Sequence, residues 1–486
     1  MNNNKLPVRF PLQYLGYLVL FFWGLVTLFL LRQDPYLLDE GAAQSLLLSW
    51  SIADQVASSV VTFGAPDLRF VLYLPIGILW TGSFFAAKVF TILLLAFTTW
   101  LLFMWQKQRT DDECALLACG LLILSPLSLA QIDSLSPGIF LLLSFVLGAW
   151  LDKSYRLSLR SFGGWYFAQL FICSLSVSLH PAGLAYPISL LWSWYKDPIN
   201  PKQQKFFFIG VSIVVLITLL IKAGWGSLAL MQNPIDSLAS IILGASVENE
   251  MTIARWISGG SLLFVLAIVI ATQYRSLWSD LVGRSLLLGM CLGAIVGDTT
   301  WGVISFGIIL FFGLPLLLRS QQFAGGFLQQ RGIALVLIII LSTLFMLSDK
   351  KHLLMRQSGI LPVQDQLIKT LAEEVESARK AAEESNKNTE NLPHIRVASQ
   401  WPSRTMIACK CDTLPLPPAT ENPEKQSSLL AGLSYLLFNP QQPNNSALAH
   451  NLAMLGGSTS ETIAMQNGGV LLHFKNVPGP SVPEKK

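Results

Sequence analysis

Three carboxylates lie where they could do chemistry, in segments that interrupt an otherwise apolar chain. Asp39 and Glu40 adjoin each other after the first apolar stretch, and Asp133 follows the third. A carboxylate in such a place could take a proton from an acceptor hydroxyl or amine, or bind a divalent metal. Structural alternatives stay open: Asp39 caps a helix that begins at Gly41, Glu40 is a solvated loop acid, and Asp133 is a turn residue.

The elements that must position these acids are membrane helices. Of the 486 residues, 52% are hydrophobic and only 13% are charged, and the mean hydropathy is +0.52. The net charge of +4 comes without a basic tract, so we expect no nucleic-acid partner. A helix that crosses the hydrocarbon core needs roughly 20 mostly apolar residues. The sequence predicts about 11 spans: Tyr14–Leu31, Phe84–Trp105, Cys114–Leu129, Pro137–Leu151, Trp165–Leu179, Ala182–Tyr195, Phe206–Ile221, Trp256–Thr272, Ser285–Val296, Trp301–Leu318 and Ile333–Leu347.

The distribution of Lys and Arg between the connecting segments predicts the topology. Basic residues gather in alternate loops, whereas the opposite loops hold acids such as Asp39 and Asp133. Because cytoplasmic loops are enriched in Lys and Arg, we expect a cytoplasmic N-terminus in a bacterial inner membrane. Residues 32–67 then form an outer loop, and residues 68–80, interrupted by Pro75, form an interfacial helix. An odd number of spans places the C-terminus in the periplasm.

The chain changes character after the last predicted span. We therefore expect a transmembrane domain over 1–347 and a small extracytoplasmic α+β domain over 348–486. Apolar residues recur every three or four positions after Pro362, which predicts a helix. Two strand-like runs follow at Ile395–Ala398 and Val470–Phe474. The fold class is thus mainly α, a polytopic helical membrane protein with a soluble C-terminal domain.

Two of the six cysteines, Cys409 and Cys411, fall in this C-terminal domain. A disulfide between residues two apart would be strained. Zinc would need further ligands, and the domain has no other cysteine. We expect no functional role for this pair.

The order of elements around Asp39 and Glu40 resembles the GT-C glycosyltransferases. An apolar helix, an outer Asp-Glu pair, loop helices and an interfacial helix precede Ser83-Phe84-Phe85-Ala86-Ala87-Lys88-Val89. The chain is most similar to the branch of polyprenyl- or dolichyl-phosphate mannosyltransferases and aminoarabinose transferases, whose second span opens on a comparable segment with Arg in place of Lys88. The resemblance covers about residues 10–195. It departs from the family at Ala42-Ala43, where an Arg-Tyr pair is common.

The resemblance implies a glycosyltransferase that inverts the sugar's anomeric centre. Asp39 would deprotonate or orient the acceptor, and Glu40 and Asp133 would position the acceptor or a metal. The donor would be a polyprenyl-phosphate-linked sugar, and the acceptor an envelope glycan, lipid or protein at the outer face of the membrane. A divalent metal, if one is used, would bind Asp39 and Asp133. Cations near the interface would hold the lipid phosphate; the candidates are Arg69, Lys88, Lys222, Arg255 and His180.

Other functions are compatible with the same sequence. A transporter or flippase of lipid-linked sugars would need ionisable residues within its spans, which are nearly free of charge apart from Lys88. A non-catalytic scaffold would present the C-terminal domain and would tolerate Asp39→Asn. A polysaccharide polymerase or ligase would carry a long outer loop late in the chain, as between Lys222 and Arg255. For each cation, the structural alternative is snorkelling toward the lipid headgroups.

Overall fold

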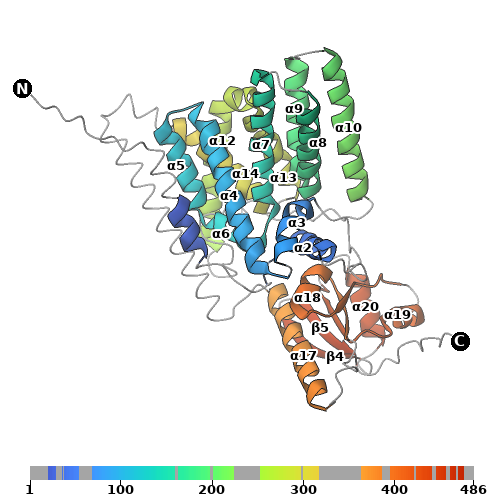
Figure 1. Ribbon diagram of the computed structural model, residues 1–486. Helices are drawn as coiled ribbons and strands as arrows, with labels where there is room; N and C mark the ends of the chain where they lie inside the picture. The colour runs from blue at the N-terminus through green and yellow to red at the C-terminus, as the bar shows by residue number, and fades with distance from the viewer. Residues whose placement is uncertain are drawn as a thin grey trace, which may run out of the picture. The chain divides into compact units, whose positions relative to one another are not determined.

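A computed structural model defines the fold (Figure 1) and describes residues 20–28, 36, 38–53, 68–80, 82–158, 162–197, 201–223, 252–296, 299–316, 363–385, 395–420, 423–440, 445–455, 460–466 and 469–474. Two compact units divide the chain. The helical unit comprises Met1–Arg32, Asp67–Leu72 and Phe85–Leu354, and the mixed unit comprises Gln33–Pro66, Tyr73–Phe84 and Met355–Lys486. The predicted domain boundary at 347 and 348 lies outside the described residues. The predicted outer loop packs within the mixed unit, with the C-terminal residues.

Five helices of the helical unit are long and apolar enough to cross a membrane, which makes the chain an integral membrane protein. Two of the predicted spans appear almost unchanged as α4 and α8, and α7, α10 and α12 are longer than predicted. The predicted span Ile333–Leu347 lies outside the described residues, and residues 20–28 of the first span are helical. The number 11 stays a prediction. The five helices are α4 (Phe84–Lys107), α7 (Pro137–Ser158), α8 (Phe162–Leu179), α10 (Pro201–Ala223) and α12 (Thr252–Ser279).

The remaining apolar helices of the unit are shorter. The segment predicted as an interfacial helix forms α3, and the predicted span Ser285–Val296 forms part of the longer helix α13. The π-helical segment η2 directly follows α14. Gln106 Nε2 donates to the Phe311 carbonyl of this segment at 2.9 Å, so the altered backbone there keeps a hydrogen-bond partner. These elements are α3 (Arg69–Leu79), η1 (Pro181–Leu184), α9 (Ala185–Lys196), α13 (Leu281–Val296), α14 (Thr299–Ile308) and η2 (Ile309–Gly313).

The predicted span Cys114–Leu129 is wrong as a single helix. The chain forms α5 (Asp112–Ile123) and α6 (Pro126–Ser134) instead. Pro126 has no N–H to continue the first helix, but its fixed φ suits the first position of a new one. Asp133 consequently lies inside α6 and not in a short turn, which corrects the prediction for its environment.

Helix packing explains the sequence His180-Pro181-Ala182-Gly183. His180 caps the turn η1, which packs against α8 and α13. A Cβ atom at Gly183 would overlap the carbonyl oxygen of Ser176 on α8. Only glycine allows the turn to approach α8 this closely.

The mixed unit is built on a five-stranded sheet of order β2-β1-β3-β5-β4. The strand β1 is parallel to β2 and β3, whereas β5 is antiparallel to β3 and β4. Helices α18 and α19 connect the parallel strands in sequence, as parallel pairing requires a crossover. The strands are β1 (Arg396–Ser399), β2 (Asp412–Pro415), β3 (Tyr435–Phe438), β4 (Ser460–Gln466) and β5 (Gly469–Phe474).

Alternating side chains give this sheet two apolar faces. Along β3, Tyr435 and Leu437 join one core, and Leu436 and Phe438 join the other. Residues of α17 and α18 complete the first core, and residues of α19 and α20 complete the second, so the sheet lies between two helical layers. Both predicted strands are confirmed. The helices are α17 (Val363–Ser385), α18 (Pro402–Cys409), α19 (Pro423–Leu430) and α20 (Ser446–Leu455).

Cys409 and Cys411 are free, buried cysteines in the first core. They pack there as small apolar side chains. Helix α2 (Glu40–Ala53), from the first predicted outer loop, packs against α18 in the same unit. The start of α2 is therefore positioned by the C-terminal part of the chain.

Candidate functional site

Lys88 and Asp133 form a buried ion pair in the helical unit. Lys88 Nζ lies 3.2 Å from Asp133 Oδ1, and each side chain is only 2% exposed. The lysine comes from α4 and the aspartate from the last turn of α6. Charges inside a helical bundle need such partners because desolvation is costly. Lys88 therefore carries a charge that Asp133 balances, and it is not a headgroup-exposed cation.

Arg69 lies at the same end of α6. Its Nη1 donates to the Leu135 carbonyl at 2.7 Å, and the side chain is buried. Leu135 ends α6 in the left-handed conformation, with φ at 53°. A guanidinium at the C-terminus of a helix can hydrogen-bond the last carbonyl groups of that helix, and its positive charge interacts favourably with the helix dipole. The structure thus brings three predicted residues, Arg69, Lys88 and Asp133, to one end of α6.

The other predicted cations have different surroundings. His180 is buried, and its Nδ1 accepts the backbone N–H of Ala182 at 3.1 Å. The imidazole thus acts as a helix cap. Lys222 and Arg255 lie on α10 and α12, but their side chains are outside the described part of the structure.

Asp39 lies at the start of α2, half-buried. Its Oδ2 accepts the backbone N–H of Ala42 at 3.2 Å. The capping alternative from the sequence is therefore confirmed, with the helix beginning at Glu40, one position earlier than expected. A carboxylate held this way has a fixed orientation, which a base requires.

Glu40 is held by backbone groups far along the sequence. Its Oε1 accepts the N–H of Ser403 at 2.7 Å, and its Oε2 accepts the N–H of Arg404 at 3.2 Å. These are the second and third residues of α18, whose own N-cap residue, Trp401, provides no side-chain acceptor. Glu40 therefore caps α18 from another element and places negative charge at the positive end of its dipole.

Burial determines the titration of Glu40. Desolvation raises the pKa of its carboxyl above the ordinary value, and the contacts with Ser403 and Arg404 oppose that shift. Burial likewise lowers the pKa of the Arg404 guanidinium, and the nearby carboxylates of Glu40 and Asp39 oppose this. Asp39, Glu40 and Arg404 thus interact electrostatically.

Arg404 also forms a buried ion pair with Asp365 at the start of α17. Sequence reasoning missed this pair. Sequence reasoning also missed the cap on α18, for which a signal was available: Pro402 marks a helix start, and Trp401 before it has no side-chain acceptor, so the cap had to come from elsewhere.

The described residues contain no group of three or more His, Cys, Asp or Glu that could hold a metal ion. Both oxygens of Glu40 accept backbone N–H groups, and Asp133 faces an ammonium group. The predicted divalent metal stays a prediction.

No family model matches the sequence, and no curated protein is significantly similar to it. Solved structures are similar in fold. ArnT from Cupriavidus metallidurans in the apo state aligns with a TM-score of 0.55 and 10% identity, over 96% of this chain and 99% of that one. ArnT bound to undecaprenyl phosphate aligns with a TM-score of 0.53 and 10% identity, over the same shares of the two chains.

A third solved structure comes from an archaeon. The oligosaccharyltransferase AglB from Archaeoglobus fulgidus, in complex with an inhibitory peptide and a dolichol-phosphate, aligns with a TM-score of 0.52 and 12% identity. The alignment covers 93% of this chain and 73% of that one. The chain has a GT-C-like fold, as the sequence resemblance predicted.

Proposed function

We propose that the protein is a membrane glycosyltransferase that moves a sugar from a polyprenyl-phosphate carrier to an envelope acceptor at the outer face of the membrane. The observation that carries the proposal is the fold similarity along 96% of the chain to ArnT, one structure of which holds undecaprenyl phosphate. AglB, whose structure holds a dolichol-phosphate, supports the same class of donor.

Asp39 is the proposed catalytic base. It lies half-buried at a helix start, and the contact with Ala42 fixes its carboxylate. The carboxylate would accept the proton of the acceptor hydroxyl or amine while that atom attacks the anomeric carbon. The bond to the lipid phosphate breaks on the opposite side, so the configuration is inverted and polyprenyl phosphate leaves.

The other predicted site residues have supporting roles in this proposal. Glu40 fixes the first turn of α2 through α18 and so positions Asp39. Asp133 and Lys88 neutralise one another. Lys222 and Arg255 are the proposed contacts for the lipid phosphate. Arg69 is a weaker candidate because its side chain is buried and orders the end of α6, and so is His180 because its Nδ1 is engaged in the cap.

The test measures release of polyprenyl phosphate by purified protein. Polyprenyl-phosphate-linked sugars, each with one of several sugar types, are incubated with protein in nanodiscs and an envelope extract as acceptor source. We expect turnover with at least one donor, and Asp39→Asn should reduce it by about 10²- to 10⁴-fold, the usual contribution of a general base.

The matched control is Glu374→Gln, which removes an exposed carboxylate of the same unit and should leave turnover unchanged. Full turnover in Asp39→Asn would contradict the assignment of the base. Absence of release from every donor by the wild-type protein would contradict the proposed reaction.

A further inference from the structure

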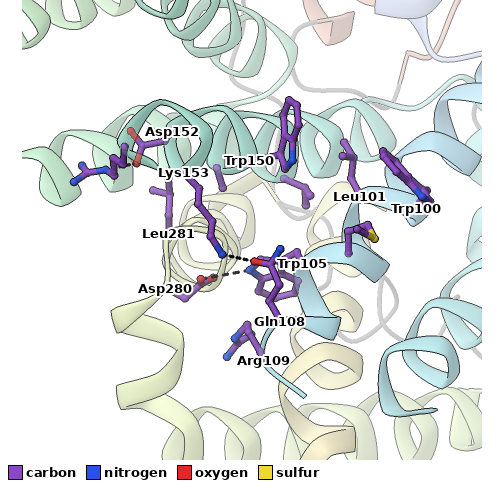
Figure 2. A pocket seen from close by; sticks show the side chains of 14 residues that line it. Trp100, Leu101, Trp105, Gln108, Arg109, Trp150, Asp152, Lys153, Asp280 and Leu281 are labelled. Atoms are coloured by element: carbon purple, nitrogen blue, oxygen red, sulfur yellow. Dashed lines mark hydrogen bonds and ion pairs between the residues drawn. The ribbon is translucent and has the colours of Figure 1, made fainter. Parts of the chain in front are cut away.

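A cavity of about 320 Å³ lies in the helical unit, away from every residue assigned above. One face of α4 and one face of α7 form most of its wall, and the start of α13 completes it (Figure 2). Spacings of three and four residues place these side chains on common helix faces. Its volume is within the range of ligand-binding pockets. The lining residues are Trp100, Leu101, Met104, Trp105, Gln108, Arg109, Val146, Ala149, Trp150, Asp152, Lys153, Arg156, Asp280 and Leu281.

The cavity lies at the opposite end of α4 from the Lys88–Asp133 pair. Lys88 is in the second turn of α4, and the helix continues to Lys107. At 1.5 Å per residue, Trp100 lies roughly 18 Å and Trp105 roughly 26 Å along α4 from Lys88. The cavity is therefore separate from the Lys88–Asp133 pair and lies toward the other end of a helix long enough to cross the membrane.

Three cations and two acids line the cavity, and the acids are already engaged. Asp280 Oδ2 accepts the Gly283 N–H at 2.9 Å, and Asp152 accepts from Trp194 Nε1 and Arg156 Nε, both at 2.8 Å. The surplus charge of the lining is positive.

Two of the cations have only neutral hydrogen-bond partners. Lys153 Nζ contacts the amide oxygen of Gln108, as the dashed line in Figure 2 shows. It makes no ion pair within the described residues. Arg109 Nη2 donates to Ser276 Oγ at 2.8 Å. Its Nη1 is buried and finds no acceptor in the part of the chain that the structure describes. Both side chains can therefore donate further to an anion.

The remaining wall is apolar and exposed. Trp100 is 36% exposed, Met104 39% and Trp150 49%, all on helices that are hydrophobic enough to span the membrane. Trp100 and Trp150 lie in the second half of their helices. Exposed tryptophan toward the end of a spanning helix is typical of the region near the headgroups of a bilayer. Apolar groups next to cations between membrane helices match both parts of a phospholipid, its acyl chains and its phosphate.

We propose that this cavity binds one anionic phospholipid. Its phosphate lies against Lys153 and Arg109, and its acyl chains lie along Trp100, Met104 and Trp150. The contact would join α4 to α7 near the end of α4 that is away from Lys88.

The experiment uses the full chain, delipidated in neutral detergent and analysed by native mass spectrometry. Phosphatidylglycerol is titrated against phosphatidylcholine with the same acyl chains. We expect one phosphatidylglycerol per protein, at least tenfold tighter than phosphatidylcholine. Lys153→Gln should weaken it about tenfold, and the matched Lys196→Gln, an exposed lysine outside the cavity, should leave it unchanged. Glycerol phosphate, which has no acyl chains, should not compete.

A second variant keeps the proposal testable if Lys153→Gln does not fold. Trp150→Leu leaves every charge in place and should reduce binding of phosphatidylglycerol by removing part of the apolar wall. Equal binding of the two lipids, an equal loss in Lys153→Gln and Lys196→Gln, or full binding in Trp150→Leu would each overturn the proposal.

Discussion

Charged side chains are buried in both units, but they are stabilised in different ways. In the helical unit, Lys88 and Asp133 neutralise one another across two helices. In the mixed unit, Glu40 instead accepts two backbone N–H groups at the start of α18, and Arg404 pairs with Asp365. The first arrangement pairs two opposite charges, whereas the second combines backbone N–H groups with an ion pair.

This difference separates structural from chemical roles among the predicted acids. The Asp133 carboxylate balances the charge of Lys88. Without that carboxylate, the Lys88 ammonium group would stay buried without its counter-charge. Glu40 is committed to a helix terminus. Asp39, which caps its own helix and is half-buried, is the acid that we propose as the base.

The largest effect is expected from breaking the pair in the helical unit. Lys88→Met should destabilise the protein by about 3–5 kcal/mol, because it leaves the Asp133 carboxylate buried without its counter-charge. The double variant Lys88→Met with Asp133→Leu should recover most of the loss. Thermal unfolding in detergent measures both, and a double variant as unstable as the single one would show that the two charges are not coupled.

A smaller loss is expected when the cap on α18 is removed. Glu40→Ala should cost the mixed unit about 0.5–2 kcal/mol, because the N–H groups of Ser403 and Arg404 lose their acceptors. Limited proteolysis of the intact protein reports on this unit. Glu374→Ala is the control and should be within about 0.5 kcal/mol of the wild type; equal sensitivity of the two variants would mean that the cap contributes nothing.

The smallest effect is a dependence on pH. Burial raises the pKa of Glu40 in the folded protein, so the folded state holds its proton to higher pH than the unfolded chain. The stability from this group is present below the unfolded pKa and is lost as pH rises through the raised one, by at most about 1.4 kcal/mol per pH unit. Glu40→Gln should flatten that part of the dependence of the free energy of unfolding on pH. Unfolding between pH 4 and 7 measures this slope, and an unchanged slope in the variant would mean that another group causes it.

Local patterns in the sequence predicted much of the fold. Apolar stretches of the required length predicted α4, α7, α8 and α10, and short strand-like runs predicted β1 and β5. The family resemblance gave the GT-C-like fold, which the solved structures confirm. The prediction failed at α6, because the apolar count ignored Pro126, which begins a new helix and places Asp133 inside it.

The sequence by itself determined that the chain is a membrane protein with a separate C-terminal part, because hydropathy and periodicity are properties of neighbouring residues. Only the tertiary structure decided the partners of the charged groups. Glu40 meets Ser403 across 363 positions of sequence, and Lys88 meets Asp133 across 45. Such contacts follow from how helices pack, and no local pattern specifies which distant N–H or ammonium group will compensate a carboxylate that burial has removed from water.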